Sequence, residues 1–75
     1  MRATDVRCIV TSPGTYAVQA RRGTLIIGYV RKLDANGRRW RAQASHWRAD
    51  EWTDMRSRDD AVGMLVAAFN GLATS

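Results

Sequence analysis

The most regular pattern of apolar and polar positions lies near the C-terminal end of the chain. Apolar residues recur there every three or four positions, which is the spacing of one helix face. They are Ala61, Val62, Leu65, Ala68, Phe69 and Leu72. Ser57 is a typical N-cap residue, Asp60 three positions later completes a capping-box-like pair, and Asn70-Gly71 is a typical stop. The pattern predicts a helix over about residues 58–70.

Earlier in the chain the apolar residues are β-branched or aromatic and tend to alternate with polar ones, which favours strands. Strands are predicted at about residues 6–10, 16–20, 24–33, 39–47 and 52–56. Ser12-Pro13-Gly14-Thr15 is a turn signal that would join the first two as a hairpin. The expected fold is a single α+β domain over residues 1–75, with an antiparallel sheet of three to five strands and the C-terminal helix on one face.

Asn36-Gly37 predicts a two-residue hairpin loop, because both residues tolerate positive φ. Ala35 would then pair with Arg38, which fixes which side chains share a face. The predicted core face carries Leu25, Ile27, Tyr29, Arg31, Leu33, Trp40, Ala42 and Ala44. The opposite face carries Val30, Lys32, Asp34, Arg39, Arg41 and Gln43, and we expect it to contact water or a ligand.

This register places Lys32 directly opposite Arg41 on the polar face. Like charges that face each other across a ladder are mildly destabilising, and an anion lying across the sheet would relieve the repulsion. The alternative is that both long side chains extend into solvent.

The basic residues are concentrated in one region. The net charge is +5, and residues 21–48 hold eight basic side chains against one acidic residue, Asp34. The remaining positions hold four basic and six acidic side chains. Such a distribution is typical of a polyanion-binding surface. The alternative is codon bias in a GC-rich genome, which explains the excess of Arg over Lys but not its placement.

Length and cysteine content bound the other possibilities. A core from 75 residues contributes only roughly 3–5 kcal/mol of stability, so a homodimer that buries more apolar surface is a further expectation. The lone Cys8 has no intrachain disulfide partner, and no secretory or membrane-spanning segment is visible. These features predict a soluble, cytoplasmic protein.

No catalytic constellation is recognisable. His46 is the only histidine, no Gly-rich phosphate loop occurs, and no cluster of three metal ligands is apparent. Cys8 lies in an apolar stretch, where a buried and inert thiol is the usual interpretation. The sequence therefore predicts a binding protein rather than an enzyme, with no cofactor, no metal and no small-molecule substrate.

Three tryptophans are interspersed with the arginines, an arrangement that single-strand and RNA binders use for base stacking. The hairpin register assigns Trp40 to the core. Trp47 and Trp52 flank a polar corner, where an exposed pair would mark an interface with a protein or a nucleobase.

From Gly28 to Phe69 the predicted order is strand, hairpin, strand, short strand and helix, with Gly37-Arg38-Arg39 and Arg58-Asp59-Asp60-Ala61 as local motifs. This order resembles the AP2-like arm-binding domains of phage integrases, over about half of the chain. The resemblance implies a sheet backed by one helix that binds DNA through the sheet. The residues it would carry over are Lys32, Arg39, Arg41 and Gln43. The chain departs from that family by carrying about two dozen residues before the shared region, and it also looks like small stand-alone proteins of actinobacteria and their phages.

The favoured hypothesis is a nucleic-acid-binding protein, with DNA preferred over RNA as the ligand. Its predicted contact residues are Arg21, Arg22, Lys32, Arg38, Arg39, Arg41, Gln43 and Arg48. The rival is a protein-interaction module, such as a phage-encoded inhibitor of a host protein or a homodimeric adaptor. That rival would use Trp47, Trp52 and an unpaired strand edge.

Overall fold

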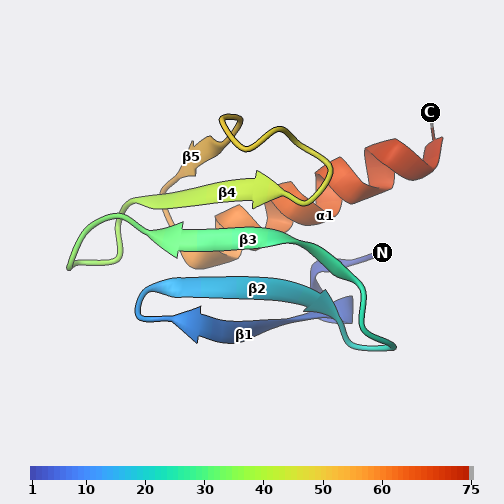
Figure 1. Cartoon of the computed structure of the whole chain (residues 1–75), viewed down its shortest axis with the longest axis horizontal. Helices are drawn as coiled ribbons and strands as arrows, with labels where there is room; N and C mark the ends of the chain where they lie inside the picture. The colour runs from blue at the N-terminus through green and yellow to red at the C-terminus, as the bar shows by residue number, and fades with distance from the viewer. Residues whose placement is uncertain (75) are drawn as a thin grey trace.

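Five antiparallel strands lie side by side in the order in which they follow along the chain (Figure 1). They are β1 (Val6–Ser12), β2 (Thr15–Ala20), β3 (Ile26–Lys32), β4 (Trp40–Ala44) and β5 (Thr53–Met55), preceded by the 3-10 turn η1 (Ala3–Asp5). The helix α1 (Arg58–Thr74) packs on β3, β4 and β5 from one side. This computed structural model describes the backbone of residues 1–74 and the side chains of residues 1–72. The expected α+β fold, an antiparallel sheet with one C-terminal helix on one face, is confirmed.

The helix begins as the sequence predicts but does not end there. Ser57 Oγ accepts a hydrogen bond from the backbone N–H of Asp60 at 3.0 Å, which satisfies one of the unpaired donors of the first turn. The predicted stop at Asn70-Gly71 is wrong, because α1 continues to Thr74. Gly71 does not adopt positive φ. The side chain of Asn70 instead forms two hydrogen bonds with Met1 at the N-terminus. Its Oδ1 accepts from the Met1 ammonium at 3.0 Å, and its Nδ2 donates to Met1 O at 2.8 Å.

The core lies between α1 and the helix-facing side of the sheet. Its buried side chains are Val6, Val18, Ile27, Val30, Trp40, Ala42, Ala44, Ala61, Val62, Leu65 and Val66. The helix contributes Val66, which the predicted stripe did not include, whereas Leu72 is 50% exposed near the end of α1. No helix within the described part of the chain is long and apolar enough to cross a membrane.

The β3–β4 hairpin differs from its prediction by one residue. Positive φ occurs at Gly37 but not at Asn36, so the type I′ loop expected for Asn-Gly does not form. Asp34 O instead accepts from Gly37 N–H, and Asp34 Oδ1 accepts from Arg38 N–H at 2.9 Å. The first paired residues are therefore Leu33 and Arg39, joined by the Leu33 N–H to Arg39 O bond of 2.8 Å. Asp34 caps the turn and lengthens the loop.

The shift by one residue exchanges the two faces of β3. Val30, expected on the polar face, is fully buried against α1, and Tyr29, expected in the core, is 44% exposed. Arg31 likewise leaves the predicted core face and lies opposite Arg41. The faces of β4 are as expected, with Trp40, Ala42 and Ala44 buried. We call the side of the sheet opposite α1 the outer face.

An irregularity in β3 explains why Ile27 is still buried. Val18 pairs with Gly28 while Gln19 pairs with Ile26, so Ile27 is an extra residue in the ladder. Such a bulge shifts the alternation of side chains on one strand. Ile27 therefore packs in the core, 2% exposed, although the next odd-numbered residues of β3 lie on the outer face.

Candidate nucleic-acid interface

A hollow of about 370 Å³ lies on the outer face, between the sheet and the β4–β5 connection. We call it the outer hollow. It is lined by Thr15, Tyr29, Arg31, Arg41, Gln43, Ala49 and Trp52. The hollow combines two arginines with two aromatic rings that are each nearly half exposed, Tyr29 at 44% and Trp52 at 46%. Cationic and aromatic side chains around one cavity are the chemistry that recognises an anionic aromatic ligand.

Gln43 builds one wall of the hollow. Its side chain points to the outer face from β4, and its Nε2 donates to Arg48 O at 2.8 Å and to Ala49 O at 2.9 Å. These bonds hold the β4–β5 connection against the sheet and bring Ala49 to the hollow. Both donors of the Gln43 amide are engaged in this way. The amide donors of Gln43 therefore hold this wall of the hollow in place, and the predicted contact of Gln43 with nucleic acid stays a prediction.

Arg41 is held in place by two neighbours. Its guanidinium carbon lies 4.2 Å from the centroid of the Trp52 ring, within cation–π range. Its Nε lies 3.7 Å from Asp54 Oδ1, is shielded from solvent and makes no hydrogen bond. Asp54 thus compensates the charge of Arg41 without a hydrogen bond from Nε. Both contacts draw Arg41 toward β5.

Arg31 is the less constrained cation of the site. It lies directly opposite Arg41 in the β3–β4 ladder and is exposed. Its side chain makes no hydrogen bond or ion pair with the residues that the structure describes. The like-charge pair expected for Lys32 and Arg41 is thus formed by Arg31 and Arg41. Lys32 lies opposite Trp40, on the helix-facing side of β3 rather than on the outer face.

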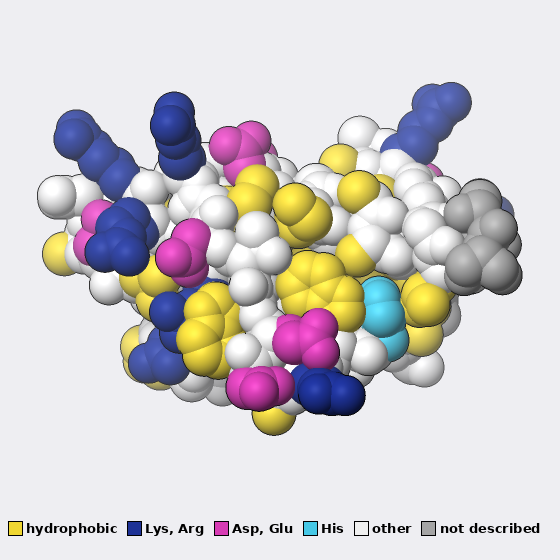
Figure 2. All heavy atoms as spheres, turned by 90° about the horizontal axis from the view of Figure 1, so that it is seen from above, with side chains coloured by type: hydrophobic (Ala, Val, Ile, Leu, Met, Phe, Trp, Pro, Cys, Tyr) yellow, Lys and Arg dark blue, Asp and Glu magenta, His cyan; other side chains and the backbone are white. Residues whose placement is uncertain are grey.

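The remaining predicted contact residues surround the sheet without converging on the hollow. Arg38 and Arg39 are exposed at the β3–β4 hairpin. Arg48 is exposed in the β4–β5 connection, with its Nε 3.8 Å from Glu51 Oε1. Figure 2 looks down on the β5 edge, where basic, acidic and hydrophobic side chains alternate instead of forming one continuous basic patch.

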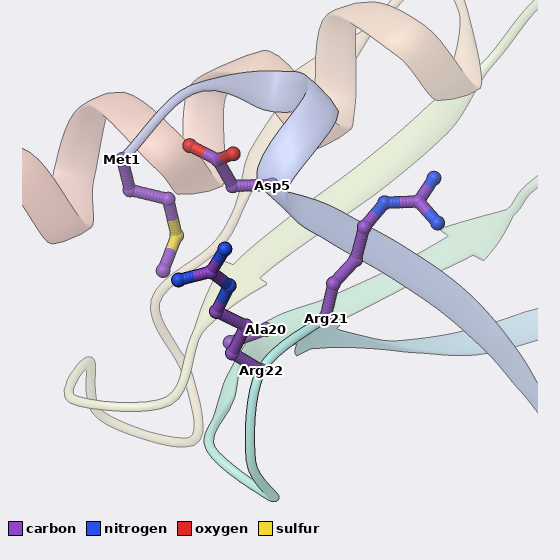
Figure 3. A pocket seen from close by; sticks show the side chains of 5 residues that line it. All are labelled: Met1, Asp5, Ala20, Arg21 and Arg22. Carbon is purple, nitrogen blue, oxygen red and sulfur yellow. The ribbon is translucent and has the colours of Figure 1, made fainter.

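Arg21 and Arg22 lie in the β2–β3 turn, at the opposite end of β3 from the hairpin (Figure 1). Together with Met1, Asp5 and Ala20 they line a second hollow of about 680 Å³. Arg21 Nε donates to Thr4 O at 2.8 Å, which ties the turn to η1. Figure 3 shows Arg22 directed toward Met1 and Asp5, while Arg21 points away from them. These two arginines therefore belong to a different surface.

The two tryptophans of the rival hypothesis differ in exposure. Trp52 is 46% exposed at the outer hollow. Trp47 is half-buried and packs against the core, and its ring is nearly perpendicular to the His46 imidazole, with 6.2 Å between the ring centroids. Trp47 and Trp52 thus do not form the exposed pair that the sequence allowed.

Cys8 is a half-buried free thiol on the helix-facing side of β1. Burial raises its pKa above the ordinary thiol value, although the nearby Arg58 guanidinium acts in the opposite direction. Among the described residues, no three His, Cys, Asp or Glu side chains come close enough to hold a metal ion.

Sequence reasoning missed four residues of the outer hollow: Thr15, Tyr29, Arg31 and Ala49. The signal for Tyr29 and Arg31 was Asp34, whose side chain caps the hairpin and shifts the register. Nothing in the sequence placed Ala49 there, because its position depends on the Gln43 contacts.

Comparisons with protein-family models, curated proteins and solved structures find no match to this chain. The resemblance to AP2-like arm-binding domains stays a prediction.

Proposed function

We propose that this chain binds nucleic acid through the outer face of its sheet, with DNA as the first ligand to test. The observation that carries the proposal is the outer hollow, where Arg31 and Arg41 face each other beside two half-exposed rings. Guanidinium groups bind phosphate through charge-assisted hydrogen bonds, and exposed rings stack on bases.

The arrangement of charge supports an anionic ligand. Two arginines opposite each other across a ladder repel, and among the described residues Asp54 forms an ion pair with Arg41 and none with Arg31. A phosphate placed between them would interact favourably with both guanidinium groups. The net charge of +5 adds a long-range field that would speed association with a polyanion.

The exposed arginines at the ends of the sheet would add phosphate contacts outside the hollow. Arg38 and Arg39, at the β3–β4 hairpin that precedes Arg41, are two candidates. Arg48, in the β4–β5 connection beside the hollow, is a third. Lys32, Arg21 and Arg22 would contribute mainly to the overall field.

Fluorescence anisotropy of labelled duplex and single-stranded DNA, titrated from low to physiological salt, tests the proposal. We expect affinity to fall steeply as salt rises, because binding releases counterions from the phosphates. Replacing both Arg31 and Arg41 with Ala should weaken binding and make it less dependent on salt. The slope of log K against log salt concentration should become less negative by about 0.7–0.9 for each phosphate that the variant no longer neutralises. The Arg22→Ala variant removes a distant charge and is the matched control. Absence of binding by the folded parent protein at low salt would refute the proposal.

A protein-interaction module is the second candidate, and the edge strand β1 favours it. β1 is seven residues long and unpaired on one side, and it exposes Ile9 at 38% and Val10 at 65%. Edge strands with exposed apolar residues readily pair with another chain, either a second copy or a host protein. Under this candidate Val10→Lys would abolish self-association or partner capture while leaving DNA binding intact. Light scattering after size-exclusion chromatography measures the first effect.

A further inference from the structure

We propose that the outer hollow takes one unpaired nucleotide of a single strand, with the base against Tyr29 and Trp52 and a phosphate at Arg31. The inference rests on the proposed function, since it names the form of nucleic acid that the same site selects. It makes base stacking the contact that selects a single strand over a duplex, which phosphate binding alone does not require.

The size of the hollow and the nature of its walls fit one nucleotide. Its volume of about 370 Å³ lies at the lower end of the roughly 300–1,000 Å³ typical of small-ligand sites. Tyr29 lies on β3 and Trp52 immediately precedes β5, so the two rings reach one cavity from different parts of the sheet. Arg41 covers one face of the Trp52 ring, and the exposed parts of both rings leave apolar surfaces in contact with water. A nucleobase is flat and apolar on its faces, and it would cover them.

Duplex DNA offers no equivalent contact. The faces of paired bases are covered by their neighbours in the stack, so side chains reach only base edges and the backbone. A single strand can turn one base out of its stack and present its face to an aromatic side chain. The rings of the outer hollow would therefore add affinity for a single strand and none for a duplex.

The two arginines of the hollow differ in their contacts, and we assign them different roles. Arg41 is engaged by Trp52 at 4.2 Å and by Asp54 at 3.7 Å, so it holds the ring in place. Arg31 makes no side-chain contact of this kind among the described residues and is available for a phosphate. A ligand would thus find one cation without an ion pair to the described residues beside a ring that is already positioned.

The walls are preorganised by the β4–β5 connection. Gln43 fixes it at Arg48 and Ala49, and the Glu51 N–H to Arg48 O bond of 3.0 Å closes the turn that leads to Trp52. Ordering a wall before the ligand arrives reduces the entropy cost of binding. Trp52 is held there without being buried, which distinguishes it from the core ring of Trp40.

The test measures how tightly the intact protein binds four ligands of equal length and similar charge per strand. An oligothymidylate of about twelve nucleotides is long enough for a site of this size. An abasic strand of the same length retains the phosphates but lacks bases, and the third ligand is a duplex containing the same thymidine strand. The fourth, an oligoribothymidylate strand, carries the same base on ribose and provides an RNA arm. Anisotropy measures affinity, and intrinsic fluorescence reports whether a base quenches tryptophan.

We expect oligothymidylate to bind about tenfold more tightly than the abasic strand, which is within the range for one base stacked on an aromatic ring. Trp52→Leu should remove most of that difference, and Trp52→Phe, which retains a ring, should restore part of it. Tyr29→Phe and Tyr29→Leu form a second matched pair. Arg31→Ala should weaken binding to every strand, whereas Arg22→Ala changes it little. Circular dichroism establishes that each variant is folded.

The outcomes separate this inference from the proposed function. Base-dependent binding that Trp52→Leu removes supports both, and the tighter of the deoxyribose and ribose strands identifies the preferred sugar. Equal salt-dependent binding of oligothymidylate, abasic strand and duplex, unaffected by Trp52→Leu, overturns the single-nucleotide site and leaves the proposed function standing. No binding of any ligand at low salt overturns both.

Discussion

Gly28 lies on the helix-facing side of β3, directly against the Leu65 side chain of α1. A Cβ added at this position would lie 2.5 Å from the backbone oxygen of Gln43 and 2.8 Å from Cδ2 of Leu65. The Leu65 side chain can adjust, but the Gln43 oxygen belongs to the neighbouring strand of the ladder. Gly28→Ala must therefore displace β4 or bend β3.

Overpacking of this kind typically costs about 1–3 kcal/mol. For a core that contributes roughly 3–5 kcal/mol in total, a loss of about 2 kcal/mol removes a large part of the stability. In a domain of this size it corresponds to a fall in Tm of about 8–16 °C. Because Gln43 also holds the β4–β5 connection, we expect the variant to weaken oligonucleotide binding as well.

Gly63 is the matched control, because a Cβ added there meets nothing within 4 Å beyond its chain neighbours and the nearby backbone of its own helix. Alanine is favoured over glycine inside a helix by about 1 kcal/mol, so Gly63→Ala should raise Tm by about 4–8 °C. Thermal and urea unfolding followed by circular dichroism measure both variants. A Gly28→Ala protein as stable as the parent, or changes of the same sign in both variants, would refute the packing argument.

Three further predictions concern Ser57, Gln43 and Cys8. Ser57→Ala should lower the free energy of unfolding by about 1 kcal/mol, measured by urea denaturation, because the helix loses its N-cap. Gln43→Ala frees two backbone carbonyls, so amide hydrogen exchange should accelerate in residues 45–52 while the core strands stay protected. Burial raises the pKa of the Cys8 thiol, so alkylation by iodoacetamide should begin at higher pH than for a free cysteine. The unfolded thiol ionises first as pH rises, so the free energy of unfolding should decrease above the ordinary thiol pKa.

Each of these has a result that would contradict it. Ser57→Asp retains a capping oxygen and should be close to the parent, so equal losses in the alanine and aspartate variants would exclude capping as the cause. Unchanged exchange in the Gln43 variant would mean that other contacts hold the connection. A Cys8 alkylation profile at or below that of free cysteine would contradict the effect of burial.

Capping preferences and the spacing of apolar residues predicted those elements that depend on residues close together in the sequence. The N-cap at Ser57, the helix that follows it and the burial of alternate residues in β4 could all be inferred, because each depends on neighbours a few positions away. Trp40 lies in the core as predicted, although the hairpin register that assigned it there is wrong by one residue on β3. Asn70 shows the limit of this approach: its side chain bonds to Met1 at the other end of the chain, and the helix continues past it.

The candidate site was predicted less well, because small local choices determine which side chains share a face. Asn-Gly favours a two-residue loop, but the Asp34 carboxylate stabilises a longer one and moves Tyr29 and Arg31 to the outer face. The bulge at Ile27 and the bonds from Gln43 to the β4–β5 connection have no clear sequence signature. The basic character of the region was visible in the sequence, whereas its division between separate surfaces was not.

The most direct test of the central claim is a two-dimensional ¹H–¹⁵N NMR titration of the protein with a short oligothymidylate. The three tryptophan indole N–H signals serve as internal reporters. We predict that the Trp52 indole and the amides of Tyr29 and Arg31 shift together in a saturable way. The Trp40 indole, buried and bonded to Gly37 O at 2.8 Å, should stay in place. Shifts confined to the β2–β3 turn or to α1, with the Trp52 signal unchanged, would contradict binding at the outer face.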